Sequence, residues 1–121
     1  MPLKKINLAA ALNSIDKHWT PTICGEVNGT QLKLVRFIGE FVWHSHADED
    51  EAFLVLYGEM TMELRDGNVQ LGPGELIVIP RGVEHRPVCA EECRVLLIEP
   101  ASTLNTGDAD DPRTLRELPR I

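Results

Sequence analysis

Several features that mark other classes of protein are missing from this sequence. No apolar run approaches the ~18 residues of a membrane-spanning helix, and no basic segment followed by an apolar one opens the chain. Positive charge is also in short supply, because 12 Lys and Arg residues face 19 Asp and Glu residues, for a net charge of −7. This balance argues against nucleic acid and against an anionic membrane as partners.

Cysteine is equally scarce. The chain has three cysteines, an odd number, and no C-x-x-C spacing. Such a set does not build a disulfide framework and is typical of a reducing compartment. We therefore expect a cytoplasmic protein that is neither secreted nor anchored in a membrane.

Helical periodicity is limited to residues 1–20, where Leu8, Leu12 and Ile15 recur at helical spacing and Asn7 is a candidate N-cap. From residue 22 to 100 the apolar residues alternate instead, in roughly eight to ten short runs bounded by turn residues, which is typical of all-β sandwiches and barrels. A chain of 121 residues, 43% of them hydrophobic, suits one core. We expect a single all-β domain with one short helix.

The turn signals refine this picture. Asn28-Gly29 and Asp66-Gly67 are dipeptides that favour tight hairpins, because their residues tolerate positive φ. Residues 76–79, LIVI, are apolar on both faces and predict a central strand. Residues 101–121 are polar and predict a tail that is loosely ordered, or packed on its own barrel or on a neighbouring subunit.

Three of the four histidines fall next to turns, together with a glutamate. His44 and His46 alternate along an extended segment, so both side chains lie on one face. An acidic turn follows, and a hairpin there returns Glu51 to the histidines; Glu49 is an alternative. A Pro/Gly turn at 80–82 places His85 at the start of a later strand. Imidazoles with a carboxylate suit Zn, Fe, Mn, Ni or Cu.

At these positions the sequence resembles the cupin superfamily over roughly residues 30–100. The first cupin motif is matched by Gly39, His44, His46, Glu51 and Gly58, and the second by Gly74, Pro80, Gly82 and His85. Two departures stand out: four residues instead of five separate Gly39 from His44, and Cys89 occupies the position of a usual Asn that is not a metal ligand in the family.

The resemblance implies a double-stranded β-helix, that is, a jelly-roll barrel, across residues 22–100. It also implies that His44, His46, Glu51 and His85 hold one divalent transition metal ion (Zn, Fe, Mn or Ni), and that the protein is a homodimer, as small cupins often are. The partner at the site is then a small molecule.

Such a ligand set leaves coordination positions for a substrate that binds through two oxygens, possibly an anionic one. It suits isomerase, lyase, hydrolase or dioxygenase chemistry, and the ligands alone do not choose among them. The leading hypothesis is a metal-dependent enzyme. The alternatives are a non-catalytic binding or sensing module, and a barrel that holds no metal.

Two residues are candidates for a role beyond metal binding. Tyr57 has the parity of Glu51 on its strand, which makes it a candidate catalytic residue in the pocket; the alternative is core packing with its hydroxyl at a turn. Arg36 holds an anionic substrate if it points inward, or is a solvated charge on the outer face.

Other residues have a structural and a functional interpretation. Met60 and Met62 line a cavity or fill the core. Cys89 lies a pleat from His85, near the metal, and is inert if buried. If His44 faces inward, Phe41 and Trp43 face outward, covered by a second sheet, by the helix or by another subunit. We read His18 as an ordinary surface or packing residue.

Overall fold

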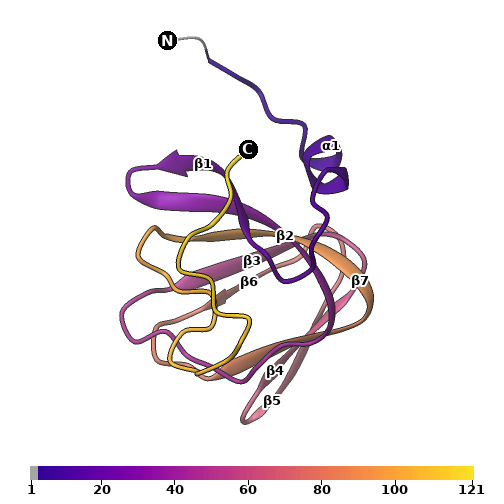
Figure 1. The fold of residues 1–121 in the computed structure, drawn as a ribbon. Helices are drawn as coiled ribbons and strands as arrows, with labels where there is room; N and C mark the ends of the chain where they lie inside the picture. The colour runs from indigo at the N-terminus through magenta and orange to yellow at the C-terminus, as the bar shows by residue number, and fades with distance from the viewer. Residues whose placement is uncertain (1–2) are drawn as a thin grey trace.

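The computed structural model describes residues 3–121, and this part of the chain forms one helix and seven strands (Figure 1). The elements are α1 (Leu8–Asn13), β1 (Thr22–Val27), β2 (Thr30–Glu40), β3 (Glu51–Tyr57), β4 (Met60–Leu64), β5 (Gly67–Leu71), β6 (Leu76–Ile79) and β7 (His85–Pro100). The predicted all-β class with a short N-terminal helix is confirmed. The sequence predicted eight to ten strands, whereas residues 3–121 form seven.

The long strand β7 accounts for the lower count. Its 16 residues join the strand predicted to open at His85 with the one predicted at 94–100. The first part of β7 pairs with β4, the second with β3, and β2 runs beside both. The β2–β7 register shifts between Phe37 and Gly39, opposite Cys93 and Cys89, and such an irregularity bends a strand. Strand β7 thereby belongs to both layers of the barrel.

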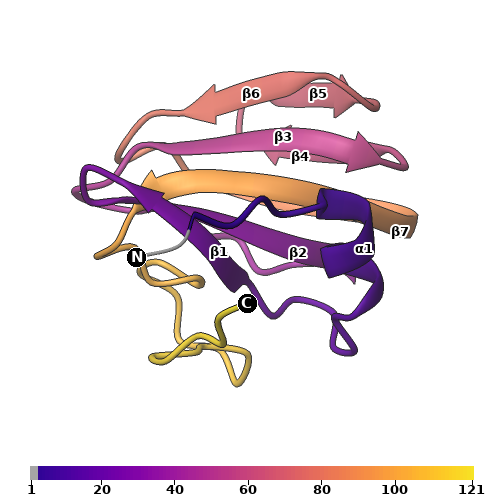
Figure 2. The same cartoon turned by 90° about the horizontal axis from the view of Figure 1, so that it is seen from above.

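The strands form a jelly-roll barrel, as predicted. One layer has the order β1-β2-β7-β3-β6, while β4 pairs with β5 and with the first part of β7 (Figures 1 and 2). All strand pairs are antiparallel. At the turn between β1 and β2, Asn28 and Gly29 both have positive φ, as the hairpin prediction requires.

Alternation along the strands fills the interior. The main core cluster consists of Val35, Phe37, Phe53, Val55, Met60, Met62, Leu71, Ile79, Cys89, Cys93, Val95 and Leu97. A second, smaller cluster lies outside the sheet, where Leu12 and Ile15 pack on Leu34 beneath α1. The backbone N–H of Ala10 donates to Oδ1 of Asn7 at 2.9 Å, which confirms the predicted N-cap.

The prediction of a central strand at residues 76–79 is wrong. Strand β6 ends the sheet order, with β3 as its neighbour. Leu76 and Val78 point outward and are each 55% exposed. Apolar residues on both faces of a strand predict burial on both faces. Leu76 and Val78 remain exposed because they lie on the outer face of an edge strand that nothing in the described chain covers.

The polar C-terminal segment packs on its own barrel. After β7 it runs along one side of the barrel and returns to β1 (Figure 1), where Arg120 forms a parallel bridge with Ile23. Thr103 and Thr106 are buried. Of the alternatives left by the sequence, packing on the chain's own barrel is therefore correct.

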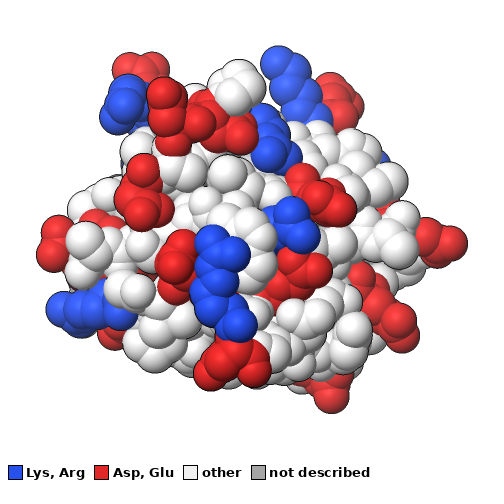
Figure 3. Space-filling model, turned by 90° about the horizontal axis from the view of Figure 1, so that it is seen from below, with Lys and Arg blue, Asp and Glu red and all other residues white. Residues whose placement is uncertain are grey.

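The surface shows mixed charge. On the face seen in Figure 3, acidic and basic side chains interleave and do not gather into a basic stripe. Among residues 3–121 no helix has the length and apolar character to cross a membrane.

Candidate metal centre

Four side chains meet inside the barrel. His44, His46, Glu51 and His85 are all buried, and each offers one ligand atom such that the four atoms lie within 4.8 Å of one another. We call this group the ligand cluster. The structure thus brings together the four residues that the sequence singled out as metal ligands.

The backbone explains this convergence. His44 and His85 face each other as an antiparallel bridge, with N–H to C=O distances of 3.1 and 2.9 Å. The N–H of Gly82 donates to the carbonyl of His46 at 2.8 Å, which ties the Pro/Gly turn to the histidine segment. Glu51 opens β3 and pairs with Ile79, whose strand leads into that turn.

Hydrogen bonds fix two of the imidazole rings with Nε2 directed into the cluster. Nδ1 of His44 donates to the carbonyl of Val42 at 2.8 Å, and Nδ1 of His85 donates to the carbonyl of Val83 at 3.0 Å. Donation from Nδ1 leaves Nε2 with the free lone pair that a metal requires.

Polar atoms within the cluster fit a cation. Nε2 of His85 and Nε2 of His46 lie 3.2 and 3.3 Å from Oε1 of Glu51. The His46 contact lacks hydrogen-bond geometry, so its buried Nε2 has no partner in the described chain. A buried polar atom without a partner is costly. Three imidazoles and one carboxylate around this point form a donor set for a divalent transition metal.

Burial also sets the protonation of the cluster. Loss of solvent lowers the pKa of His44 to about 4, so this ring is neutral at neutral pH. Burial alone would raise the pKa of Glu51, but the contact with Glu99 and the close nitrogens of His46 and His85 hold it well below its usual range. Neutral imidazole and ionised carboxylate are the forms that bind metals.

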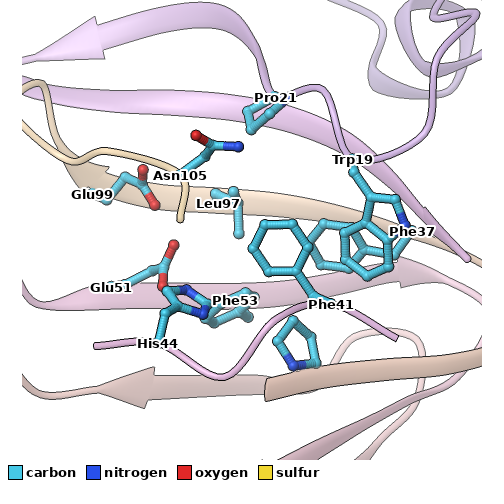
Figure 4. Close-up of a pocket in the computed structure, with 11 residues that line it drawn as sticks. Trp19, Pro21, Phe37, Phe41, His44, Glu51, Phe53, Leu97, Glu99 and Asn105 are labelled. Atoms are coloured by element: carbon cyan, nitrogen blue, oxygen red, sulfur yellow. The ribbon is translucent and has the colours of Figure 1, made fainter. Parts of the chain in front are cut away.

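A small cavity of about 20 Å³ adjoins the cluster (Figure 4). His44, Glu51, Glu99 and Asn105 lie at one end, and aromatic side chains lie at the other. The cavity is therefore divided into a polar end beside the ligand cluster and an apolar end remote from it.

The apolar end is built by stacked rings. Trp19 stacks on Phe37 and on Phe41, with centroid distances of 4.4 and 4.8 Å. The expectation that Phe41 faces outward is wrong: it is 8% exposed and its ring meets His44 edge-on at 5.3 Å. Strand β2 ends at Glu40, so the strict alternation on which that expectation relied does not continue to Phe41.

Trp43 does not line this cavity. Its ring is half-buried beneath the guanidinium of Arg65, whose Cζ lies 3.8 Å from the ring centroid. The guanidinium of Arg86 also lies near the ring, with Cζ 5.5 Å from its centroid, so two arginine side chains contribute to its burial.

Sequence reasoning missed two residues at the polar end. Glu99 and Lys33 form a buried ion pair, with Oε2 and Nζ 2.7 Å apart and both side chains 2% exposed. Burial and the adjacent Glu51 raise the pKa of Glu99 well above its usual range, in spite of Lys33. The sequence did contain a signal for both residues. Lys33 lies on the same strand face as Val35 and Phe37, and Glu99 lies on the same face as Val95 and Leu97.

The C-terminal segment supplies a third missed residue, Asn105, which lines the cavity. Its amide is held by the chain, since Nδ2 donates to the carbonyl of Arg113 and Oδ1 accepts from the N–H of Leu115, both at 2.9 Å. The polar sequence of residues 101–121 has no pattern that predicts a contact with the cavity.

The placement of Tyr57 corrects the prediction of an inward catalytic residue. Its side chain is 60% exposed and lies against Arg94, whose Cζ is 5.4 Å from the ring centroid. The register between β3 and β7 shifts between Val55 and Tyr57, so the parity inherited from Glu51 is lost. Tyr57 does not belong to the ligand cluster or the cavity beside it.

The remaining candidates have structural positions. Arg36 donates to Glu92 and to the carbonyl of Ile15, and does not line the cavity. Met60 and Met62 are in the core. Glu49 accepts from Ser102 at 2.9 Å and lies outside the cluster.

Two further residues complete the set. Cys89 is buried in the core, where a hydrogen bond with Cys93 and burial raise its pKa, so the thiol is inert. His18 is half-buried, and its Nε2 lies 2.8 Å from Oε1 of Glu92.

Comparison with known proteins agrees with this geometry. The family profile described as "Cupin domain" matches residues 37–99, which include the ligand cluster. The uncharacterized protein YdbB of Bacillus subtilis (strain 168) is 36% identical over 84 residues, covering 69% of this chain and 74% of that protein. A cupin-2 domain containing protein from Shewanella frigidimarina NCIMB 400 is 47% identical with a TM-score of 0.77, covering 78% of this chain and 93% of that one.

A more distant likeness extends to an enzyme. Hydroquinone 1,2-dioxygenase from Sphingomonas sp. TTNP3, solved in complex with 4-nitrophenol, is 22% identical with a TM-score of 0.75. The match covers 82% of this chain and 33% of that one, and at this identity it shows a shared fold.

Proposed function

This chain belongs to the cupin superfamily, and from that premise we propose that it is a metal-dependent enzyme acting on a small molecule. The observation that carries the proposal is the buried ligand cluster, in which four ligand atoms converge beside a cavity. His44, His46, Glu51 and His85 would hold one Zn, Fe, Mn or Ni ion. A bound ion of this kind polarises oxygen ligands, acidifies water or, as iron, activates dioxygen.

The cavity favours a substrate with an apolar body and oxygens at one end. Rings of Trp19, Phe37 and Phe41 suit a planar apolar group, and the polar end places substrate oxygens beside the ligand cluster. No arginine lines this cavity among the described residues, which disfavours a phosphate group. A hydroxylated ring matches the chemistry of both ends, and dioxygenase chemistry acts on such rings.

Isomerase or lyase chemistry on a hydroxy or keto acid is the second enzymatic candidate. Such a substrate would place its oxygens at the polar end of the cavity. Glu99 also lines that end, and its carboxyl group is not one of the four proposed metal ligands. The apolar end contributes less to such a substrate, so we rank this chemistry second.

A binding or sensing module is the alternative outside catalysis. Tyr57 is remote from the cavity, and the amide of Asn105 is bonded to the backbone, so the described residues offer few free groups for proton transfer there. Metal and ligand binding without turnover would follow from that arrangement.

The metal content of protein purified without added metal tests the first step. We expect close to one ion per chain in the wild type and less than a tenth of that in His85→Ala. Tyr57→Phe is the matched control, because Tyr57 is exposed and remote, and it should keep the wild-type metal content. Full metal content in His85→Ala would refute the ligand assignment.

Turnover assays then separate the reaction classes. The Fe(II) form should consume oxygen with a hydroxylated ring, and Phe41→Ala should bind 4-nitrophenol at least about tenfold more weakly than wild type, since an aromatic wall is lost. Oxygen uptake with keto acids alone, or isomerisation by the Mn or Zn form, would favour the second candidate. Ligand binding with no turnover would favour the sensing module.

The outer face of the sheet supports a homodimer as part of this proposal. Two rows of apolar side chains cross it in register, and no charged residue interrupts them: Leu76, Leu54 and Leu96 in one row, and Val78, Ala52, Ile98 and Leu32 in the other. Helix α1 packs on the end of the first row, at Leu34. An apolar sheet face of this kind, half-buried in its middle and exposed at Leu76 and Val78 on an open edge strand, is typical of subunit interfaces.

The predicted cytoplasmic location stays a proposal as well. All three cysteines, at positions 24, 89 and 93, are free thiols, which suits a reducing compartment.

A further inference from the structure

A buried ion pair lies beside the ligand cluster. Lys33 on β2 and Glu99 on β7 both point into the barrel, where their side chains are 2% exposed and 2.7 Å apart. Removing two charges from water is expensive, and apolar residues of similar size often replace such a pair with no loss of stability. The pair is therefore poorly explained by folding alone.

Glu99 connects this pair to the cluster. Lys33 donates to Oε2 of Glu99, while the buried Oε1 receives no hydrogen bond from an N–H or alcohol donor of the described chain. The carboxyl groups of Glu99 and Glu51 face each other at the polar end of the cavity (Figure 4). Lys33 thus fixes Glu99 through Oε2, and the carboxyl group held in this way faces that of Glu51.

Glu51 has few other side-chain partners. Its other polar side-chain contacts are the Nε2 atoms of His46 and His85, at 3.3 and 3.2 Å. These nitrogens are proposed ligands, and a bound ion would occupy their lone pairs. The carboxyl group of Glu99 would then be the remaining side-chain partner that holds Glu51 in orientation.

We infer that Lys33 and Glu99 form a positioning element of the metal centre, in which Lys33 fixes Glu99 and Glu99 orients the carboxylate of Glu51 toward the three histidines. The inference rests on the proposed metal site and goes beyond its four ligands. Hydrogen-bond partners of metal ligands fix ligand geometry, and their loss typically costs about 10- to 100-fold in metal affinity.

Two double variants isolate the hydrogen bond from the charge. Lys33→Met/Glu99→Leu and Lys33→Met/Glu99→Gln have the same net charge and both lack the ion pair, but only Gln has an amide N–H that can donate to the carboxylate of Glu51. Co²⁺ is the probe, because its visible absorption reports the coordination geometry. Urea unfolding of each metal-free variant checks that the barrel is intact.

The Leu variant should bind Co²⁺ about 10- to 100-fold more weakly than wild type, with altered absorption bands. The Gln variant, which lacks Lys33 but keeps a polar side chain facing Glu51, should bind Co²⁺ more tightly than the Leu variant, with bands closer to those of the wild type. Wild-type affinity and bands in both variants would overturn the inference, and so would equal weakening in both, because the donor to Glu51 would then be irrelevant.

The proposed function fails in a different way. If the wild type binds no Co²⁺, or if His85→Ala binds it as tightly as the wild type, the four-ligand site is wrong and the positioning role falls with it. If the wild type binds Co²⁺ and His85→Ala does not, the comparison of the Leu and Gln variants decides the role of Glu99 alone.

Discussion

Gly107 of the C-terminal segment lies against the imidazole of His44. A Cβ atom built at position 107 would lie 3.2 Å from Cδ2 of His44 and would overlap the backbone carbonyl oxygen of Ser45. The residue also has φ of +56°, a conformation that side chains disfavour. Asp108 fastens this contact, since its Oδ1 accepts from the N–H of Ser45 at 2.8 Å.

Gly107 is not a proposed metal ligand, but Gly107→Ala should disturb the ligand cluster through its contact with His44. The overlap is with backbone, which cannot move aside as a flexible side chain would, so we expect a loss of about 2 to 4 kcal/mol in the free energy of unfolding. Displacement of His44 should also weaken Co²⁺ binding. Urea denaturation and Co²⁺ titration measure the two effects.

Gly29→Ala is the matched control for backbone strain. Gly29 has φ of +78°, and a Cβ there would meet no atom within 4 Å. It should lose about 1 kcal/mol and bind Co²⁺ as the wild type does. Equal Co²⁺ affinity in Gly107→Ala and Gly29→Ala would show that the tail does not support His44.

Removal of the metal should lower the thermal stability. Ligand atoms buried in the native barrel are dispersed in the unfolded chain, so an ion at about 1,000 times its Kd adds about 4 kcal/mol to the free energy of unfolding. For a chain of this length the melting temperature should fall by roughly 10 to 20 °C on chelation. Differential scanning calorimetry with and without EDTA measures the shift.

His46→Ala serves as the reference for chelation, because it removes a proposed ligand whose buried Nε2 has no hydrogen-bond partner in the described chain. Its melting temperature should not respond to EDTA. A response as large as that of the wild type would place the stabilising ion elsewhere.

Glu92 should make stability depend on pH below about 4.5. Burial alone would raise its pKa, but hydrogen bonds from Arg36, His18 and Arg94 lower it to about 2. The pKa is lower in the folded chain than in the unfolded one, so the stabilisation is complete above the unfolded value of 4.5 and is lost as the pH falls toward 2.

Comparison with Glu92→Gln isolates this contribution. The free energy of unfolding should differ by about 2 kcal/mol at pH 7, a figure reduced for the partial exposure of Glu92, and the difference should shrink between pH 4.5 and 2. The adjacent Glu91→Gln is exposed and should show little difference at either pH. A wild-type advantage over Glu92→Gln that does not change with pH would contradict the assignment.

Much of the fold and of the ligand cluster follows from local patterns. Alternation along each strand predicts which side chains share the interior, and Asn28-Gly29 predicts a hairpin through its backbone preference alone. His44 and His46 meet because extended backbone repeats every two residues. The two motifs then specify which glutamate and which third histidine join them.

Other features depend on register and tertiary contact, which a single sequence does not contain. Tyr57 leaves the interior because β3 and β7 change register beside it. Phe41 enters the cavity because β2 has already ended. Parity with Val95 and Leu97 points Glu99 inward, but no local pattern shows that its partner is Lys33 on another strand.

Val78→Lys should dissociate the proposed dimer. Val78 is 55% exposed on the edge strand β6, so a lysine there is solvated in the isolated chain and the fold should survive. In an interface between the outer faces of two chains the same ammonium would be buried without a partner, at a cost of about 2 to 5 kcal/mol. Val27→Lys is the control, since Val27 is 61% exposed but lies on β1 at the other end of the sheet order. Sedimentation equilibrium should give a dimer for the wild type and Val27→Lys and a monomer for Val78→Lys; a wild-type monomer, or a dimer in all three, would exclude this face as the interface.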